Sequence, residues 1–301
     1  MYSSITLFAD TNTSGKVFYN YSINLDEQRN NAFNMKRAYL TFANDVSETV
    51  SYKVTYDMGS NEGGSAHTAF LKVAMVKWNT SLGDVSIGMR GMNMFKTMEN
   101  TWGHRFIQKM PMDTYGFSPS ADLGIGLTRG FGAISTSVLV TNGGGYKNAE
   151  SDSHKKFSFH AVFGEPKLNK NDGFNAGTSF SVEPYDIDST TTANTNVMGI
   201  FAGYGGPGFR GGLEFDTKQQ NDITSQIICV YGTYKISDKL SLLARLDQVE
   251  GNISVKEDGA IIVGVHYGLE KGLTVAPTVR MTRQEGGETE NEIVVNFQFQ
   301  F

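Results

Sequence analysis

The last twelve residues, Glu290–Phe301, constrain the fold most, because apolar and polar side chains alternate along nearly their whole length. A period of two is typical of a β-strand whose two faces meet different surroundings. One parity holds Ile293, Val295, Phe297, Phe299 and Phe301, and the other holds Val294, Asn296, Gln298 and Gln300. Such an aromatic face is an aggregation hazard on a soluble sheet edge, but it suits a strand placed between lipid and a water-filled lumen. The pattern favours a transmembrane barrel strand over a core strand of a soluble sandwich.

Similar alternation recurs along the chain and predicts an all-β fold, a single antiparallel up-and-down β-barrel of about 16 strands over residues 15–301. The connections after even-numbered strands are mostly short, and those after odd-numbered strands are mostly long and polar. This is the arrangement of periplasmic turns and extracellular loops at the two rims of a barrel. The predicted strands are 15–24, 33–43, 48–58, 66–80, 85–92, 122–129, 131–141, 154–163, 174–182, 196–204, 209–216, 223–234, 239–248, 258–268, 272–282 and 290–301.

Composition narrows the functional classes. The net charge of −5 argues against nucleic-acid binding. A single cysteine, Cys229, and the absence of a Cys/His cluster predict no disulfide, metal or cofactor. The five histidines have no serine constellation near them, so we expect no enzyme.

The N-terminal segment 1–14 is interpreted as a signal-peptide remnant or a periplasmic tail, with Tyr2–Ala9 as the apolar part.

Two segments carry a resemblance to a known family. Asn31–Asp57 (NAFNMKRAYLTFANDVSETVSYKVTYD) resembles the N-terminal hairpin of phosphate-selective porins, and Thr101–Gly124 is similar to the long loop of related porin-like proteins. The resemblance implies a channel of the bacterial outer membrane, commonly a homotrimer, in contact with lipid and lipopolysaccharide. It also implies that Phe297, Phe299 and Phe301 are an assembly signal that the barrel-insertion machinery reads. Phosphate selectivity is not carried over, because the arginine ladder and phosphate-binding lysines do not align.

Cations at inward positions are the candidate pore-lining residues. Inward facing follows from opposition to apolar neighbours on the same strand. The predicted inward acids are Asp57, Glu214, Asp216 and Asp247, so wall cations outnumber acids about two to one. The charges either pair with one another, as Arg210 with Glu214 or Arg245 with Asp247, or give the pore an anion preference. The predicted pore-lining cations are Arg37, Lys53, Arg90, Lys156, Arg210, Arg245 and Arg280, and also Lys72, on a strand that carries apolar residues on both parities.

Segment 93–121 is the candidate pore-constricting loop. It is the third long connection and is too rich in aromatic and Met residues for a freely solvated loop tip. The alternatives are a loop folded over the barrel mouth and a contact between subunits. Its candidate constriction residues are Lys96, His104, Arg105, Lys109 and Asp113.

These features together predict a passive diffusion channel for small hydrophilic solutes or ions. Two other classes stay open at this point. One is a non-conducting outer-membrane barrel used for adhesion or surface binding, and the other is a soluble all-β binding protein. A conductance step in a planar bilayer separates the first class from the second, and partition into detergent separates both from the third.

Overall fold

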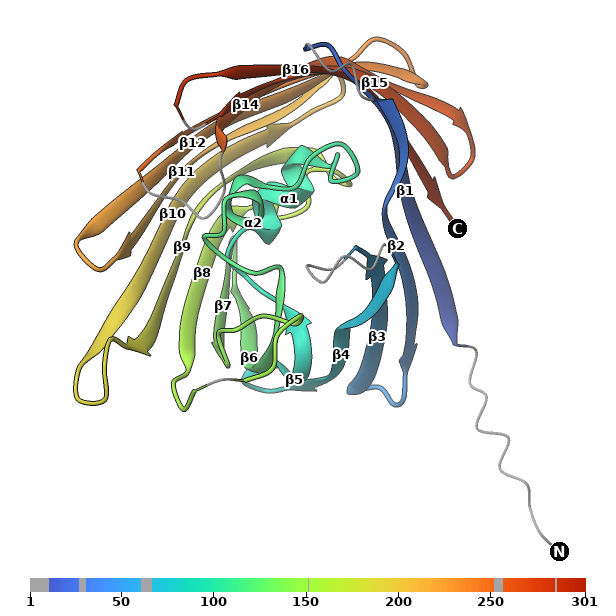
Figure 1. The fold of residues 1–301 in the computed structure, drawn as a ribbon. Helices are drawn as coiled ribbons and strands as arrows, with labels where there is room; N and C mark the ends of the chain where they lie inside the picture. The colour runs from blue at the N-terminus through green and yellow to red at the C-terminus, as the bar shows by residue number, and fades with distance from the viewer. Residues whose placement is uncertain (1–10, 27–30, 61–66, 151, 252–256, 285) are drawn as a thin grey trace, which may run out of the picture.

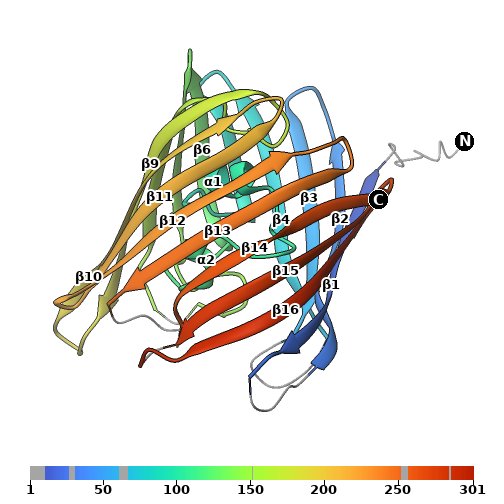
Figure 2. The same ribbon diagram turned by 90° about the horizontal axis from the view of Figure 1, so that it is seen from above.

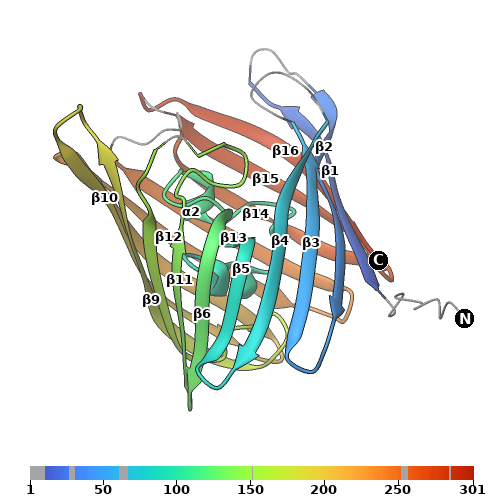
Figure 3. The same ribbon diagram turned by 90° about the horizontal axis from the view of Figure 1, so that it is seen from below.

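The computed structural model is a closed barrel of sixteen antiparallel strands, in which each strand pairs with its neighbours in sequence and β1 pairs with β16. It describes residues 11–26, 31–60, 67–150, 152–251, 257–284 and 286–301. Figure 2 shows β11 to β16 on one side of the wall, and Figure 3 shows β3 to β6 on the other. The strands are β1 (Asn12–Asn24), β2 (Asn31–Asp45), β3 (Val50–Gly59), β4 (Thr68–Thr80), β5 (Gly83–Gly91), β6 (Ala121–Phe131), β7 (Ile134–Thr141), β8 (Lys156–Gly164), β9 (Gly173–Asp186), β10 (Thr192–Gly205), β11 (Phe209–Gln220), β12 (Ile223–Lys235), β13 (Leu240–Glu250), β14 (Glu257–Glu270), β15 (Leu273–Gln284) and β16 (Thr289–Gln300).

The predicted fold class is confirmed, but two predicted loops are wrong. Much of segment 183–195 belongs to β9 and β10, and segment 217–222 is mostly the end of β11, so that only a two-residue connection precedes β12. These strand ends are polar, and a hairpin that extends beyond the lipid needs no apolar face. The polar residues therefore mark where these strands leave the lipid, and the strands themselves continue beyond that point. The segment Tyr2–Ala9 lies outside the described residues.

The outward side chains of the described strands are mostly apolar. Alternation predicted this face except on β4, β10 and β12, whose facing the sequence left undecided. The facing of β4 was ambiguous in the sequence, and a bulge resolves it. The pairing register with β3 shifts between Thr55 and Tyr56, so both Lys72 and Val73 border the lumen. The extra residue reverses the parity of the strand. Consequently Leu71 faces outward before the bulge, and Val76 and Trp78 face outward after it.

The long segment between β5 and β6 lies inside the barrel. It contains two short helices, α1 (Lys96–Trp102) and α2 (Pro111–Thr114), which Figure 1 shows within the ring of strands. Helix α1 contacts β10, β11 and β12, and α2 contacts β12. No helix in the described part of the chain is long and apolar enough to cross a membrane.

An apolar seat on the inner wall holds this loop. Strands β10, β12 and β14 carry apolar side chains on their inward as well as their outward parity, which is unusual for a barrel with a watery lumen. The inward side chains form one buried cluster with the loop, so the loop has a fixed place. From the loop the cluster includes Met94, Met98, Trp102, Phe106, Met110, Met112 and Tyr115, and from the wall it includes Val197, Phe201, Ile227, Cys229, Tyr231 and Ile262.

Candidate functional site: a cationic cavity in the barrel

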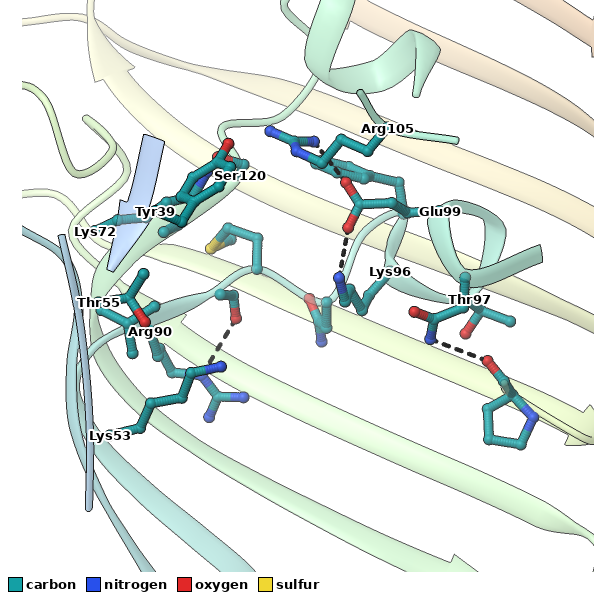
Figure 4. Close-up of a pocket in the computed structure, with 18 of the residues that line it drawn as sticks. Tyr39, Lys53, Thr55, Lys72, Arg90, Lys96, Thr97, Glu99, Arg105 and Ser120 are labelled. Atoms are coloured by element: carbon teal, nitrogen blue, oxygen red, sulfur yellow. Dashed lines mark hydrogen bonds and ion pairs between the residues drawn. The ribbon is translucent and has the colours of Figure 1, made fainter. Parts of the chain in front are cut away.

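The loop divides the lumen into a sealed side and an open side. On the open side a cavity of about 700 Å³ lies between the loop and the wall from β1 to β8. Among the described residues that line this cavity, Glu99 is the one acid. The cations that line it are Lys16, Lys53, Lys72, Arg90, Lys96 and Arg105. Figure 4 shows five of these cations around the cavity, with Glu99 between Lys96 and Arg105.

The acidic residues of the wall lie on the sealed side. Glu214, Asp216 and Asp247 are inward as predicted, but each is at most 2% exposed. The guanidinium of Arg245 donates to Asp247 from Nε at 2.8 Å and from Nη2 at 2.7 Å. The predicted Arg245–Asp247 pair therefore exists, and the loop separates it from the cavity.

Several predicted pore-lining cations do not reach the cavity, and their assignment is corrected. Arg245 is buried against Asp247, and Lys156 is 2% exposed and donates to Glu183 at 2.8 Å. Arg280 pairs with Glu257 at 3.1 Å, outside the cavity lining. These three cations do point inward from their strands, but the loop and nearby carboxylates surround them instead of water.

The predicted pairing of Arg210 with Glu214 is wrong. Arg210 donates instead to the backbone carbonyl of Trp102 at 3.3 Å, at the end of α1. The next residue of the loop is Gly103, at φ 73°, where a Cβ would come within 2.6 Å of the Arg210 guanidinium. The loop therefore approaches this strand so closely that the arginine meets the end of the helix.

Two wall cations that face the cavity were missed or only weakly indicated in the sequence. Lys16 lies on β1 and shares its parity with the aromatic Phe18, so the alternation did not show which face of this strand points inward. Lys72 was obscured by the bulge in β4. Lys36 also turns inward and donates to the carbonyl of Ile107 at 3.1 Å, because a register shift in the β1–β2 pairing falls at this position. An irregularity of one residue was not readable from alternation.

The candidate constriction residues form a compact ion-pair network on the loop. Arg105 donates to Glu99 at 2.5 Å and to Asp113 at 3.0 Å, and Lys96 and Lys109 pair with the same two acids at 2.5 and 3.3 Å. Burial raises the pKa of the Glu99 carboxyl, but the charges of Arg105 and Lys96 outweigh it and lower this pKa to about 2. The same opposition, with Arg105 again the main cation, lowers the pKa of Asp113. Most of the loop charge is thus compensated within the loop.

His104 has a structural position. It is 4% exposed, and its Nε2 lies 3.0 Å from the hydroxyl of Thr233. Burial, followed by the charges of Arg210 and His266, lowers the pKa of this ring well below its usual range. A neutral, buried ring adds no charge to the cavity, so the assignment of His104 to the constriction is corrected.

The network predicts how the loop responds to acid. Glu99 has a folded-state pKa below its ordinary value of 4.5, so its ion pairs stabilise the loop fully above pH 4.5 and are lost as pH falls through about 2. We expect steady wild-type single-channel current between pH 7 and 4.5. Arg105→Gln removes the larger cationic partner, returns the pKa of Glu99 toward 4.5, and should make the current noisy as pH approaches that value.

Lys109→Gln is the matched control for that experiment. It removes a loop cation that pairs with Asp113 but does not contact Glu99, and Asp113 keeps Arg105. Its current should follow the wild-type pH dependence. An identical pH response in the Arg105→Gln and Lys109→Gln channels would contradict the role assigned to Arg105.

The closed sixteen-stranded barrel, the inward third loop and the charged lumen define the class of outer-membrane porins. The chain belongs to the family of phosphate-selective porins O and P, whose family model matches residues 14–206. The resemblance found in the sequence is thereby confirmed. No curated protein matches the chain significantly.

Three solved structures show the same fold at low sequence identity. OmpF of Salmonella typhi is 13% identical with a TM-score of 0.75, over 97% of both chains. An anion-selective porin of Comamonas acidovorans is 11% identical with a TM-score of 0.70, over 97% of this chain and 99% of the other. OmpT of Vibrio cholerae, an outer-membrane protein in trimer form, is 13% identical with a TM-score of 0.64, over the same shares. Such similarity supports the barrel architecture and carries no ligand to this chain.

Proposed function

We propose that this protein is a bacterial outer-membrane porin through which small hydrophilic solutes diffuse, with a preference for anions. The observation that carries the preference is the group Lys16, Lys53 and Arg90, on β1, β3 and β5. These three cations line the cavity, and none forms an ion pair with a carboxylate of the described residues. Fixed charge of one sign along a narrow, weakly screened path lowers the barrier for ions of the opposite sign.

The segregation of charge strengthens this proposal. The chain as a whole is acidic, with a net charge of −5, yet six cations and one carboxylate line the cavity. Because the loop covers Glu214, Asp216 and Asp247, those acids do not offset the cavity cations at close range. The loop thus narrows the lumen and also hides the acidic part of the wall.

Location and assembly follow from the same reasoning. The outward aromatic and aliphatic face suits outer-membrane lipid and lipopolysaccharide, and the terminal Phe suits the barrel-insertion machinery. A homotrimer is our proposal for the assembly, supported by family membership and by the trimer form of the Vibrio cholerae neighbour. Chemical cross-linking in detergent, followed by sizing of the cross-linked species, tests it.

The anion preference is tested by reversing two of the uncompensated charges. We expect Lys53→Glu with Arg90→Glu to turn the channel from anion-preferring to cation-preferring, so the reversal potential in a KCl gradient changes sign. The shift should be greatest at low salt, where screening is weakest. The measurement is the reversal potential of the purified protein in planar bilayers.

Arg283→Glu is the control for this charge reversal. Arg283 is exposed at the end of β15, outside the cavity lining, and donates to the carbonyl of Asp258. Its reversal potential should stay at the wild-type value. A double variant with a wild-type reversal potential would overturn the anion preference, and a wild type without any current steps would favour the non-conducting barrel for adhesion.

A further inference from the structure

The connection between β7 and β8 extends from its own strands to the wall formed by β3 and β4. Its first half is anchored on segment 119–122: the amide of Gly143 donates to the Asp122 carboxylate at 2.6 Å, and the amide of Tyr146 donates to the carbonyl of Ala121 at 3.0 Å. Gly145, at φ 78°, passes so near Pro119 that a Cβ would lie 2.9 Å from that ring. The glycine run Gly143–Gly145 therefore permits the sharp path that brings Tyr146 to the lumen.

Tyr146 ends this path on a buried carboxylate. Its hydroxyl donates to Oδ2 of Asp57 at 2.7 Å, and its ring meets Phe70 edge-on with centroids 6.2 Å apart. The Lys72 amino group lies 5.2 Å from the centroid of the same ring, within cation–π range. Burial, and then the charge of Asp57, raise the pKa of Tyr146, so the hydroxyl remains a donor.

The carboxylate of Asp57 connects several elements, because it accepts hydrogen bonds from two other strands and from the loop. It is 0% exposed, and it accepts from Arg37 on β2 at 3.5 Å, from Lys72 on β4 at 3.3 Å and from Tyr146. Lys72 also lies 5.0 Å from the centroid of the Tyr39 ring. A buried carboxylate requires such donors, and charge-assisted hydrogen bonds hold their partners firmly. The position of Lys72, which lines the cavity, thus depends on Asp57.

We propose that Tyr146 and Asp57 form a latch that holds loop 142–150 against the β3–β4 wall as a second constriction, and that this latch limits the size of the solutes that pass. The proposal rests on the channel function proposed above and adds a size filter to it. Asp57 is a positioning residue: it orients Lys72 and Tyr146, and it neutralises one of the two cations that it binds.

The sharpest test is Tyr146→Phe, which removes one hydroxyl and keeps the ring. We expect liposomes that contain this variant to swell several-fold faster in uncharged oligosaccharides that scarcely enter through the wild type. The reversal potential in KCl should not change, because no charge is removed. Tyr185→Phe is the matched control, since the Tyr185 hydroxyl donates to Asn221 in an exposed position at the end of β9. Its swelling rates should equal those of the wild type.

Two further measurements separate the latch from the channel function. Asp57→Asn should speed the same swelling and also shift the reversal potential toward anions, because Arg37 and Lys72 lose their counter-charge. Trypsin should cut after the exposed Lys147 several-fold faster in Tyr146→Phe than in wild type, and this readout needs no conduction. Faster cutting in a protein that never conducts would leave the latch intact and reject the channel function. If the wild type does conduct, swelling of Tyr146→Phe at the wild-type rate would overturn the proposal, whatever the rate of cutting.

Discussion

Val54→Arg is expected to leave most of the protein unfolded when it is refolded into lipid vesicles. Val54 lies at the middle of β3, faces outward, and is flanked by Phe42 on β2 and Ala74 on β4. An arginine on the lipid face near the bilayer midplane costs about 2–4 kcal/mol. That cost is a large part of the stability of an ordinary domain. The folded fraction is read from heat-dependent mobility on gels and from a urea titration.

Thr55→Arg is the paired control at the next residue. Thr55 faces the cavity, where its hydroxyl lies 2.9 Å from that of Thr41. An arginine there enters a water-filled space lined with other cations, so we expect a wild-type folded fraction and a small loss of stability. Equal destabilisation by the two variants would mean that β3 does not separate lipid from a lumen.

Deletion of Phe301 is expected to reduce the assembled barrel in the outer membrane severely, with synthesis unchanged. Phe301 closes the seam between the first and last strands: its amide donates to the carbonyl of Gly15 at 3.1 Å, and its carbonyl accepts from the amide of Gly15 at 3.0 Å. Its ring covers Gly15, where a Cβ would collide with it. The aromatic side chain itself is 64% exposed, so little buried area is lost by the deletion.

Phe301→Trp distinguishes recognition from seam packing. A terminal aromatic residue is retained, so recognition by the insertion machinery should persist, while the larger ring changes the contact with Gly15. We expect near-wild-type assembly in cells from this variant. Quantitative blotting of outer-membrane fractions measures both variants, and normal amounts of folded protein after the deletion would refute the role of Phe301 as an assembly signal.

The fold was predictable because the information for a barrel strand is local. Each strand contacts lipid on one side, so every second side chain is apolar, as Phe297 and Phe299 are in β16. The pattern failed where one extra residue broke the alternation, as in β4 before Val73, and where polar strands continued beyond the lipid, as in β11. In neither case does a neighbouring side chain signal the change.

Only the structure explained why some strands carry apolar side chains on both faces. In β12, Ile227 and Tyr231 face inward while Ile228 and Val230 face outward, so the sequence left the facing of this strand undecided. Both faces are apolar because the strand contacts lipid outside and the loop with α1 and α2 inside. The inward loop itself was predicted from its aromatic content, but the wall residues that hold it lie far along the chain and could not be paired with it by pattern alone. The hydroxyl of Tyr231, for example, donates to the carbonyl of Met98, 133 residues earlier.

The sequence by itself determined that charges on regularly alternating strands, such as Lys53 and Arg245, point into the barrel, since strand parity places both on the inner face. Only the tertiary structure decided which of them meets water. Arg245 lies under the loop with Asp247 as its partner, whereas Lys53 faces the cavity and forms no ion pair with a described carboxylate. The physical reason is that compensation of a charge depends on groups within a few ångströms, and such groups come here from other strands and from the loop. Tyr146 is a further case, because its partner Asp57 lies 89 residues earlier in the chain.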